Sequence, residues 1–262
     1  MTAEEKLKKV RCFLLDMDGT LYLEDGLIGD MKATLSAVRD SGRKIVYLTN
    51  NSSKSADVYK EKLMRLGIFD ARDDIYTSGM ATARYLNLHY PKKPVFLVGT
   101  DALAAEFEKN GVRISEDADI AVLGYDTTLT YEKLCKIDEK LRRGATFIAT
   151  HPDTVCPAKN GSVPDIGSFL ALLKASSGRE PDVICGKPYA AMGEAISDHL
   201  GYLPEELLMA GDRLYTDIRF AINSGFFSLL VYSGETTKED YEKSGMTVDL
   251  ALGTLNEVVR YL

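Results

Sequence analysis

The chain has 262 residues, of which 45% are hydrophobic and 27% are charged, and it carries a formal net charge of -7 with a pI near 5.2. This composition is ordinary for a soluble globular protein of one large or two smaller domains. The acidic balance argues against a nucleic-acid polymer as a partner, because no run of Lys and Arg offsets it. No window reaches the roughly 18 apolar residues that a membrane span needs.

The four cysteines, Cys12, Cys135, Cys156 and Cys185, are scattered and form no C-x-x-C pair. The N-terminal segment MTAEEKLKKV is polar and lacks the apolar stretch of a signal peptide. Together these features predict a cytoplasmic protein with reduced thiols. Only three histidines occur, and none forms an H-x-x-H arrangement, so a zinc enzyme is not expected.

An apolar run near the start of the chain ends in two acids. Cys12–Leu15 predicts a strand buried on both faces of a parallel sheet, and Asp16 and Asp18 follow it. In near-extended backbone these two carboxylates point to the same side, and Gly19 then permits a turn. Two like charges in this position need a divalent cation between them or a shared proton. Taken alone, a D-x-D pair is also compatible with a plain acidic turn.

The full string DMDGT resembles the first motif, D-x-D-x-T, of the haloacid dehalogenase superfamily, most of whose members are magnesium-dependent phosphatases. The resemblance implies that Asp16 attacks phosphorus. It also implies that Asp18 acts first as a general acid and then as a general base.

A second strand ends in hydroxyl and amide side chains. Met31–Arg39 predicts a helix with Asp30 as its N-cap, and Lys44–Leu48 predicts the strand. Thr49 and Asn50 follow it. This cluster is compatible with a simple helix N-cap and also with a phosphate cradle of backbone N–H groups. It resembles the second superfamily motif, in which Thr49 and the Asn50 backbone hold the phosphoryl oxygens.

The middle of the chain carries strands and helices of its own. A helix over Ala56–Leu66 and a strand over Asp74–Ser78 come first. The pattern then predicts alternating strands and helices over Val95–Val98, Ala102–Lys109, Ile120–Leu123, Tyr131–Arg142 and Thr146–Thr150. These elements suffice for a small α/β domain. Because it interrupts the series of polar strand ends, the stretch 81–179 is predicted to be an insertion.

A passage rich in Pro, Gly, Asp and Asn, residues 151–167, lies inside the insertion. An irregular loop of that length is typical of a functional segment, although an ordinary surface connection is also compatible with it. A helix over Phe169–Ala175 and a linker over residues 176–181 complete the insertion.

A lysine stands at the next strand end. Val183–Cys185 predicts the strand, and the string GKP, with Lys187 at its centre, follows it. The pattern is not a Walker loop, and Pro188 fits the first turn of a helix that runs to Leu200. By itself such a lysine is typically exposed to solvent. The string resembles the third superfamily motif, in which Lys187 neutralises charge on the nucleophile and the phosphate.

Leu207–Ala210 predicts a core strand that also ends in acids, in the string GDRLYTD. This string resembles the fourth superfamily motif. The resemblance implies that Asp212 completes a metal site with Asp16 and Asp18, of which Asp18 uses its backbone carbonyl. It further implies that Asp217 orients a metal-bound water or Lys187.

Two elements close the chain. Phe226–Tyr232 predicts a further core strand. Leu255–Leu262 predicts a helix, at the start of which Thr254 and Glu257 have the spacing of a capping box.

The four motifs in this order, with an insertion between the second and the third, resemble the NagD-type subfamily. That subfamily carries a type 2a cap and includes 4-nitrophenylphosphatases and pyridoxal phosphatase-like enzymes. The resemblance implies an α/β fold: a doubly wound, Rossmann-like parallel sheet as the core (1–80 and 180–262) and an inserted α/β cap (81–179).

The implied activity is magnesium-dependent hydrolysis of small phosphate monoesters through an aspartyl-phosphate. Sugar phosphates and nucleotides are the natural candidates, and p-nitrophenyl phosphate is the artificial one. The implied partner is a small phosphorylated metabolite, and the sequence leaves open whether the chain forms a homodimer.

The cap would choose the substrate, because the four motifs contact only the phosphoryl group and the metal. By position the candidates are Tyr125 and the loop with Asp153, Cys156 and Pro157. Tyr125 can stack on a ring and donate a hydrogen bond, and Asp153 can accept one from a sugar hydroxyl. Cys156 stands where resembling pyridoxal phosphatases place a histidine, which argues against pyridoxal phosphate as the main substrate.

Three alternative functions remain open from the sequence. A phosphomutase of the same superfamily would share all four motifs. A non-catalytic phospho-accepting module would need neither Asp18 nor so large an insertion. A nucleotide-dependent dehydrogenase would need G-x-G-x-x-G after the first strand, where this chain has acids.

Overall fold

The computed structural model describes residues 2–24, 26–158 and 161–262, apart from the side chains of Pro157 and Ala158. The chain divides into two compact units. Unit 1 consists of Met1–Thr49, Ala56–Tyr76 and Ile196–Leu262, and unit 2 consists of Asn50–Ser55 and Thr77–Ala195. Each unit has its own sheet.

The sheet of unit 1 has six strands in the order β14-β13-β12-β1-β4-β5. Their bounds are β1 Cys12–Leu15, β4 Lys44–Thr49, β5 Asp74–Thr77, β12 Leu207–Gly211, β13 Phe227–Val231 and β14 Leu250–Leu252. The central strand β1 pairs in parallel with β4 on one side and β12 on the other. The chain therefore reverses its winding direction at β1, and ligands of such sheets bind beyond the carboxyl ends of the strands at that point.

All four residues of β1 are fully buried, as the continuous apolar run predicts. Helices α2 (Met31–Asp40) and α3 (Ala56–Arg65) contribute Leu35 and Leu63 to the core on one face of the sheet. Asp30 caps α2 as predicted, because its Oδ1 accepts a hydrogen bond from the Ala33 N–H at 3.2 Å.

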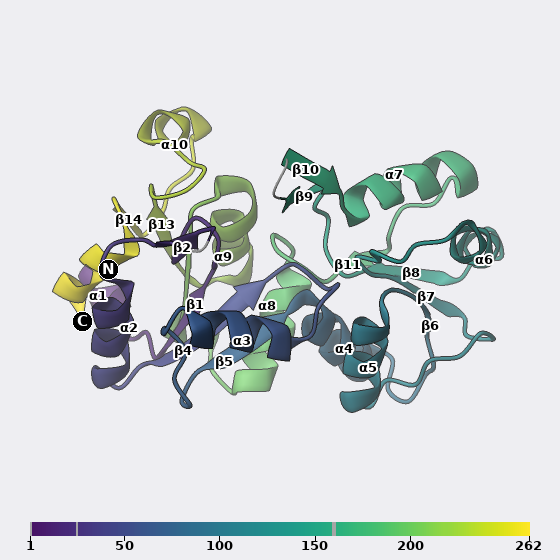
Figure 1. Cartoon of the computed structure of the whole chain (residues 1–262), viewed down its shortest axis with the longest axis horizontal. Coiled ribbons are helices and arrows are strands. Elements are labelled where there is room, and N and C mark those ends of the chain that lie inside the picture. Colours follow the sequence, from purple (N-terminus) through teal and green to yellow (C-terminus); the bar gives the residue numbers. More distant parts are fainter. Residues whose placement is uncertain (1, 25, 159–160) are drawn as a thin grey trace. The chain divides into compact units, whose positions relative to one another are not determined.

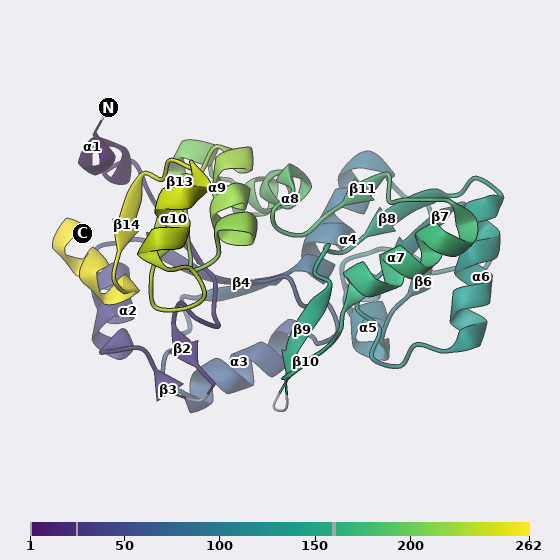
Figure 2. The ribbon, with the colours of Figure 1, turned by 90° about the horizontal axis from the view of Figure 1, so that it is seen from above.

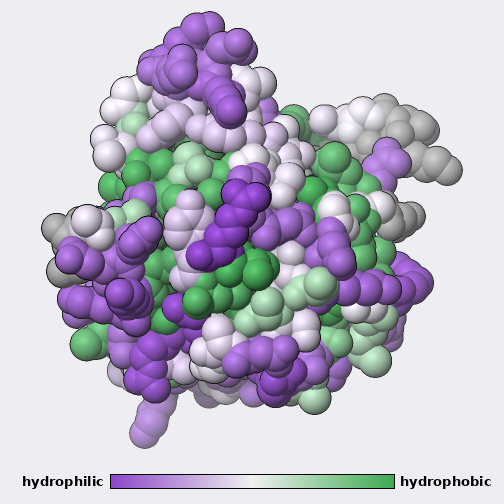
Figure 3. Space-filling view, turned by 90° about the vertical axis from the view of Figure 1, so that its left-hand side faces the viewer, coloured by the Kyte–Doolittle hydropathy of each residue, from purple (hydrophilic) through white to green (hydrophobic). Residues whose placement is uncertain are grey.

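Shorter elements complete unit 1. They are α1 (Ala3–Leu7), β2 (Tyr22–Leu23), β3 (Gly26–Leu27), η1 (Pro204–Glu206), η2 (Leu214–Ile218), α9 (Arg219–Ser224), α10 (Lys238–Ser244) and η3 (Leu255–Tyr261). The closing helix, η3, is a 3-10 helix, and the Glu257 carboxylate accepts from the Thr254 N–H at 3.1 Å, as a capping box requires. Hydrophilic and hydrophobic residues are intermixed on the side where the two termini lie (Figure 3).

Unit 2 contains a four-stranded parallel sheet in the order β11-β8-β7-β6. The strands are β6 (Phe96–Val98), β7 (Ile120–Leu123), β8 (Thr146–Ala149) and β11 (Val183–Ile184). Helices α6 (Tyr131–Arg142) and α7 (Ile166–Ser177) cover one face, and α4 (Ser78–His89) and α5 (Asp101–Lys109) cover the other (Figure 1). The chain leaves unit 2 within helix α8 (Ala190–Leu200), since its residues up to Ala195 belong to unit 2 and those from Ile196 belong to unit 1.

The alternation of side chains along β7 explains how both faces of this sheet are filled. Ala121 and Leu123 pack with α6 and α7, whereas Ile120 and Val122 pack with α4 and α5. A strand that is apolar at every position is thereby buried on both sides. The predicted α/β class with a parallel core sheet is confirmed.

The predicted elements were wrong or incomplete in several places. The passage 151–167 is not irregular throughout, because it contains the antiparallel hairpin β9 (Val155–Ala158) and β10 (Gly161–Pro164) beside α7 (Figure 2). Prolines are tolerated in it because a two-stranded ribbon leaves one edge of each strand unpaired. Helix α4 was not predicted, since its small residues show little amphipathic pattern, and α10 and β14 were also missed.

Candidate active site

Three carboxylates of unit 1 meet where β1 and β12 end. Asp16 follows β1, Asp212 follows β12, and Asp217 lies on the π-helical turn η2. One oxygen from each of the three lies within 4.8 Å of the others. Because β1 and β12 are parallel neighbours, their carboxyl ends share one edge of the sheet, which brings together acids that are almost 200 residues apart in sequence.

Glycines leave the space that these carboxylates occupy. A Cβ on Gly19 or on Gly234 would overlap the Asp212 carboxylate, and one on Gly211 would overlap Asp217. Gly19 also has φ +82°, a backbone conformation that residues with a Cβ disfavour. The acids are therefore enclosed by backbone on several sides.

The hydrogen bonds around Asp212 are incomplete. Its Oδ2 accepts from the Glu235 N–H at 2.7 Å, but among the described residues its buried Oδ1 has no hydrogen-bond partner. Asp217 accepts from the Arg213 N–H at 3.2 Å. Burial and the neighbouring Asp217 raise the pKa of Asp212. A buried carboxylate oxygen without a partner, in a group of oxygen donors only, fits a hard divalent cation.

Arg213 is the cation closest in sequence to this acidic group, and sequence reasoning assigned it no role. Burial alone would lower the pKa of its guanidinium, but Asp16, Asp217 and Asp212 together raise it. Its Nε lies 3.4 Å from the Glu235 carboxylate, which also accepts from the Tyr215 hydroxyl at 2.8 Å. The available signal was its position directly after Asp212 in GDRLYTD.

In unit 2, the Asn50 side chain joins segments that are far apart in sequence. Its Oδ1 accepts from the Lys187 N–H at 2.9 Å, and its Nδ2 donates to the Lys187 carbonyl at 3.0 Å. The same Nδ2 lies 3.1 Å from one carboxylate oxygen of Asp153. The Asn50 carbonyl accepts from the Ser78 hydroxyl. Asn50 and Lys187 are both buried.

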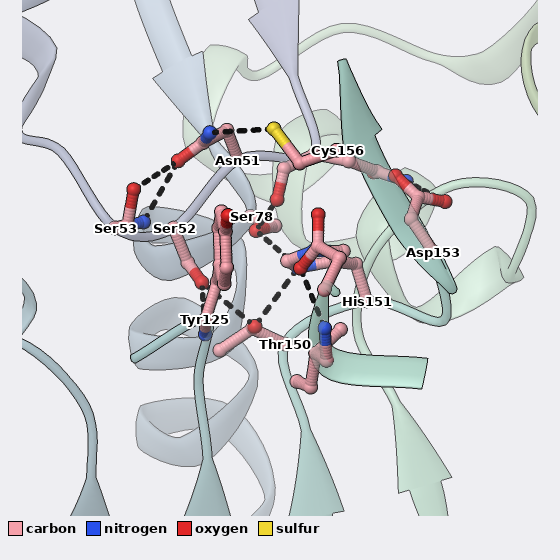
Figure 4. Close-up of polar contacts among 12 residues, drawn as sticks. Asn51, Ser52, Ser53, Ser78, Tyr125, Thr150, His151, Asp153 and Cys156 are labelled. Atoms are coloured by element: carbon pink, nitrogen blue, oxygen red, sulfur yellow. Dashed lines mark hydrogen bonds and ion pairs between the residues drawn. The ribbon is translucent and has the colours of Figure 1, made fainter. Parts of the chain in front are cut away.

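Hydroxyl groups attach the segment Asn50–Ser55 to the rest of unit 2 (Figure 4). The Ser52 Oγ lies 2.9 Å from the Thr150 Oγ1 and accepts from the Tyr125 N–H at 2.9 Å. His151 is fully buried beside them, with its Nε2 3.0 Å from Asp165 and its Nδ1 3.0 Å from the Thr150 hydroxyl. Sequence reasoning missed His151, because a lone histidine before Pro carries no motif.

The comparisons with known proteins agree with this geometry. Residues 13–113 match the family described as haloacid dehalogenase-like hydrolase, and residues 184–258 match a second family described as HAD-hydrolase-like. The chain is 33% identical to the 5'-nucleotidase YutF of Bacillus subtilis (strain 168) over 98% of this chain and 100% of that protein. It belongs to the haloacid dehalogenase-like hydrolases.

Two further similarities extend this result. An acid sugar phosphatase of Staphylococcus aureus is 32% identical over 98% of this chain and 99% of that protein. The crystal structure of a 4-nitrophenylphosphatase from Thermotoga maritima has a TM-score of 0.91 and 42% identity, covering 97% of this chain and 98% of that one. The predicted family, its core fold and the predicted enzyme class, a hydrolase of the phosphatase type, are confirmed.

The dehalogenase-like hydrolase brings together some predicted site residues and not others. Asp16 and Asp212, both predicted as metal ligands, lie in the acidic group, and Asp217, predicted to orient a water or Lys187, lies in that group with them. The Asp18 carboxylate lies elsewhere, 3.5 Å from the Tyr22 hydroxyl and 3.9 Å from the Lys62 amine. The metal contact through the Asp18 backbone carbonyl stays a prediction.

The remaining predicted residues lie at strand ends or in unit 2. Thr49 is the half-buried last residue of β4. Tyr125 is 5% exposed, with its ring edge-on to His151, and burial, Cys156 and Asp165 raise its pKa to about 12. The Cys156 Sγ lies 4.0 Å from the Asn51 amide nitrogen. The side chain of Pro157 lies outside the described residues.

Membrane attachment by a spanning helix finds no support. Over residues 2–24, 26–158 and 161–262, no helix combines the length and the apolar character that crossing a bilayer requires.

Proposed function

We propose that this chain is a magnesium-dependent phosphatase that hydrolyses small phosphate monoesters through an aspartyl-phosphate on Asp16. The observation that carries the proposal is the group of three carboxylates, Asp16, Asp212 and Asp217, at the strand ends of a dehalogenase-like hydrolase. In the proposal, residues 1–80 and 180–262 are the catalytic core and residues 81–179 the cap.

In the first step, an Asp16 oxygen attacks phosphorus while the bond to the leaving oxygen breaks. Asp18 gives its proton to that leaving oxygen. In the second step, Asp18 takes a proton from water, whose oxygen attacks phosphorus and releases phosphate from Asp16. Asp18 suits proton transfer because its carboxylate lies outside the acidic group, and 62% of its side chain is exposed.

Charge on the phosphoryl oxygens needs compensation in both steps. Lys187 supplies a fixed positive charge, and Thr49 and the Asn50 backbone donate hydrogen bonds. Asp16, Asp212 and the Asp18 carbonyl would hold the metal, with Asp217 orienting its water or Lys187. When bound, Mg²⁺ supplies positive charge to the nucleophile and the phosphate.

The substrate is proposed to be a sugar phosphate or a nucleotide. The relatives described above are named for a nucleotidase, an acid sugar phosphatase and a 4-nitrophenylphosphatase. Tyr125, Cys156 and Pro157 are proposed to contact the part of the substrate beyond the phosphate. No disulfide joins the four cysteines in the described part of the chain, which suits a reducing cytoplasm.

A screen of phosphorylated metabolites and p-nitrophenyl phosphate tests the proposal, with phosphate release measured in the presence of Mg²⁺. We expect release from several sugar phosphates or nucleotides, without any bisphosphate activator. Transfer of phosphate within a sugar, with no release, would indicate the phosphomutase alternative. A protein that releases phosphate from none of the compounds would overturn the proposal.

A further inference from the structure

The Asn50 amide oxygen and both of its N–H groups have partners within unit 2. A primary amide has two N–H groups and one carbonyl oxygen. Here the oxygen accepts from the Lys187 N–H, one N–H reaches the Lys187 carbonyl, and the other faces the two Asp153 oxygens at 3.1 and 3.3 Å. These three partners allow only one orientation of the amide, because a flipped side chain would place its oxygen against two acceptors.

This pairing fixes the backbone of Lys187 from both sides. The N–H and the carbonyl of the same residue are held by the two ends of one planar amide. Gly186 adds to the constraint, because a Cβ there would overlap the Thr150 carbonyl and the His151 side chain. The Asn50 backbone is in turn held by the Ser78 hydroxyl. The Lys187 peptide therefore sits in a packed, fully hydrogen-bonded setting.

Asp153 is the charged partner of the Asn50 side chain, because Lys187 meets that side chain through its backbone N–H and carbonyl. Its carboxylate takes the Asn50 N–H that Lys187 does not use. Without that acceptor, a buried N–H would lose its partner, and the amide would rotate or admit water. A half-buried acid that points at the Asn50 amide is placed to orient it.

We propose that Asp153 is a positioning residue for Lys187, acting through the Asn50 amide, and that it does not select the substrate. The inference rests on the proposed function, in which Lys187 supplies the positive charge for the phosphate. It replaces the sequence-based interpretation of Asp153 as an acceptor for a sugar hydroxyl. Because the phosphoryl group is common to all substrates, misplacing Lys187 reduces turnover of every monoester alike.

Kinetics on two substrates separate the two roles. In Asp153→Ala we expect kcat/KM to fall by about 10- to 100-fold, and by the same factor for the best metabolite and for p-nitrophenyl phosphate. Asp153→Asn keeps an oxygen that can accept from Asn50, so it should recover part of the loss. Asp117→Asn removes one exposed negative charge elsewhere in unit 2 and serves as the matched control, with activity close to wild type.

A double-mutant cycle tests whether Asp153 acts through Asn50. If it does, Asn50→Ala combined with Asp153→Ala should be no slower than Asn50→Ala alone, because the second change removes a contact already lost. Additive losses would overturn the proposal. A loss in Asp153→Ala confined to the metabolite would overturn it too, since that is the signature of substrate contact.

Hydrogen exchange gives a readout that needs no turnover. The Lys187 N–H is protected by the Asn50 Oδ1, so Asp153→Ala should speed its exchange by about tenfold, with no change in the amides of β6 to β8. Unchanged exchange at Lys187 would overturn the proposal even if activity fell. An inactive wild-type protein with the predicted exchange would instead contradict the proposed function and leave the Asp153–Asn50–Lys187 linkage standing.

Discussion

The two units concentrate opposite kinds of polar chemistry. In unit 1, Asp16, Asp212 and Asp217 gather like charges, and one buried oxygen of Asp212 has no partner among the described residues. In unit 2, the amide of Asn50 and the hydroxyls around it meet donors and acceptors that match. In unit 1 a buried oxygen of Asp212 is left for a cation to satisfy, whereas in unit 2 the amide and the hydroxyls satisfy one another. Substitutions in the two units should therefore fail in different ways.

The largest effect is expected at the nucleophile. Asp16→Asn keeps the size of the side chain and removes the attacking anion, so turnover should fall by several orders of magnitude. Folding should survive, because one member of a repulsive group has lost its charge. Phosphate release and circular dichroism check the two halves. A variant that keeps more than about a tenth of the wild-type rate would remove Asp16 from the mechanism.

The next largest effect is expected from removing the metal, which should act on unit 1, where the acidic group lies. Chelation should abolish activity, Mg²⁺ should restore it, and Ca²⁺ should inhibit, since its longer and looser coordination misplaces the nucleophile. Saturating Mg²⁺ should also raise the free energy of unfolding of the wild type, by about 2 to 3 kcal/mol at a hundredfold excess over Kd. Thermal unfolding with and without Mg²⁺ measures this.

Asp212→Asn supplies the matched variant for the metal. Without Mg²⁺, its unfolding temperature should be at least as high as that of the wild type, because the substitution relieves repulsion among the acids. Added Mg²⁺ should raise that temperature very little. Equal stabilisation of both proteins by Mg²⁺ would mean that the ion binds somewhere other than the acidic group.

The sequence was sufficient for those features that a short stretch encodes. An apolar run followed by an acid predicts a strand end such as Asp16 or Asp212, and parallel pairing then brings the two together. It was not sufficient for the Asn50 network, because Asp153 and Lys187 lie 103 and 137 residues away and nothing in their local pattern indicates the pairing. The position of Asp217 inside the acidic group depends on the π-helical turn η2, which also has no local signature.

A smaller effect is expected at Tyr125, where a substitution tests whether unit 2 contacts the substrate. Tyr125→Phe keeps the ring edge-on to His151 and removes only the hydroxyl. If that hydroxyl bonds to the substrate, kcat/KM should fall by about tenfold for the best metabolite and much less for p-nitrophenyl phosphate. Identical losses on both compounds would assign Tyr125 to the internal packing of unit 2.

The smallest effect is expected at Asp249, an acid of unit 1 whose carboxylate is paired with Lys6 and Ser228. Burial would raise the pKa of Asp249, but hydrogen bonds from Lys6 and Ser228 lower it. A lowered pKa stabilises the fold above the unfolded pKa of about 3.9, and this contribution is lost as the pH falls through the folded value.

Asp249→Asn should therefore lower the free energy of unfolding by about 1 kcal/mol at neutral pH, with the difference shrinking below about pH 4. Urea unfolding at several pH values measures it, and activity should not change. A gap that stays constant down to acid pH would show that packing, not charge, is what the substitution disturbs.

The discontinuity of unit 1 has a consequence for the order of events during synthesis. All of unit 2 has been made once residue 195 is complete, whereas unit 1 still lacks its last segment, Ile196–Leu262. Until then β1 has its neighbour β4 but not β12, so one edge of the central strand has no partner while the chain is still attached to the ribosome. Translation that stops before residue 196 would release a chain whose unit 2 is whole but whose central strand β1 is open to pairing with another copy. Residues 196–262 are therefore expected to limit aggregation as well as to supply Asp212.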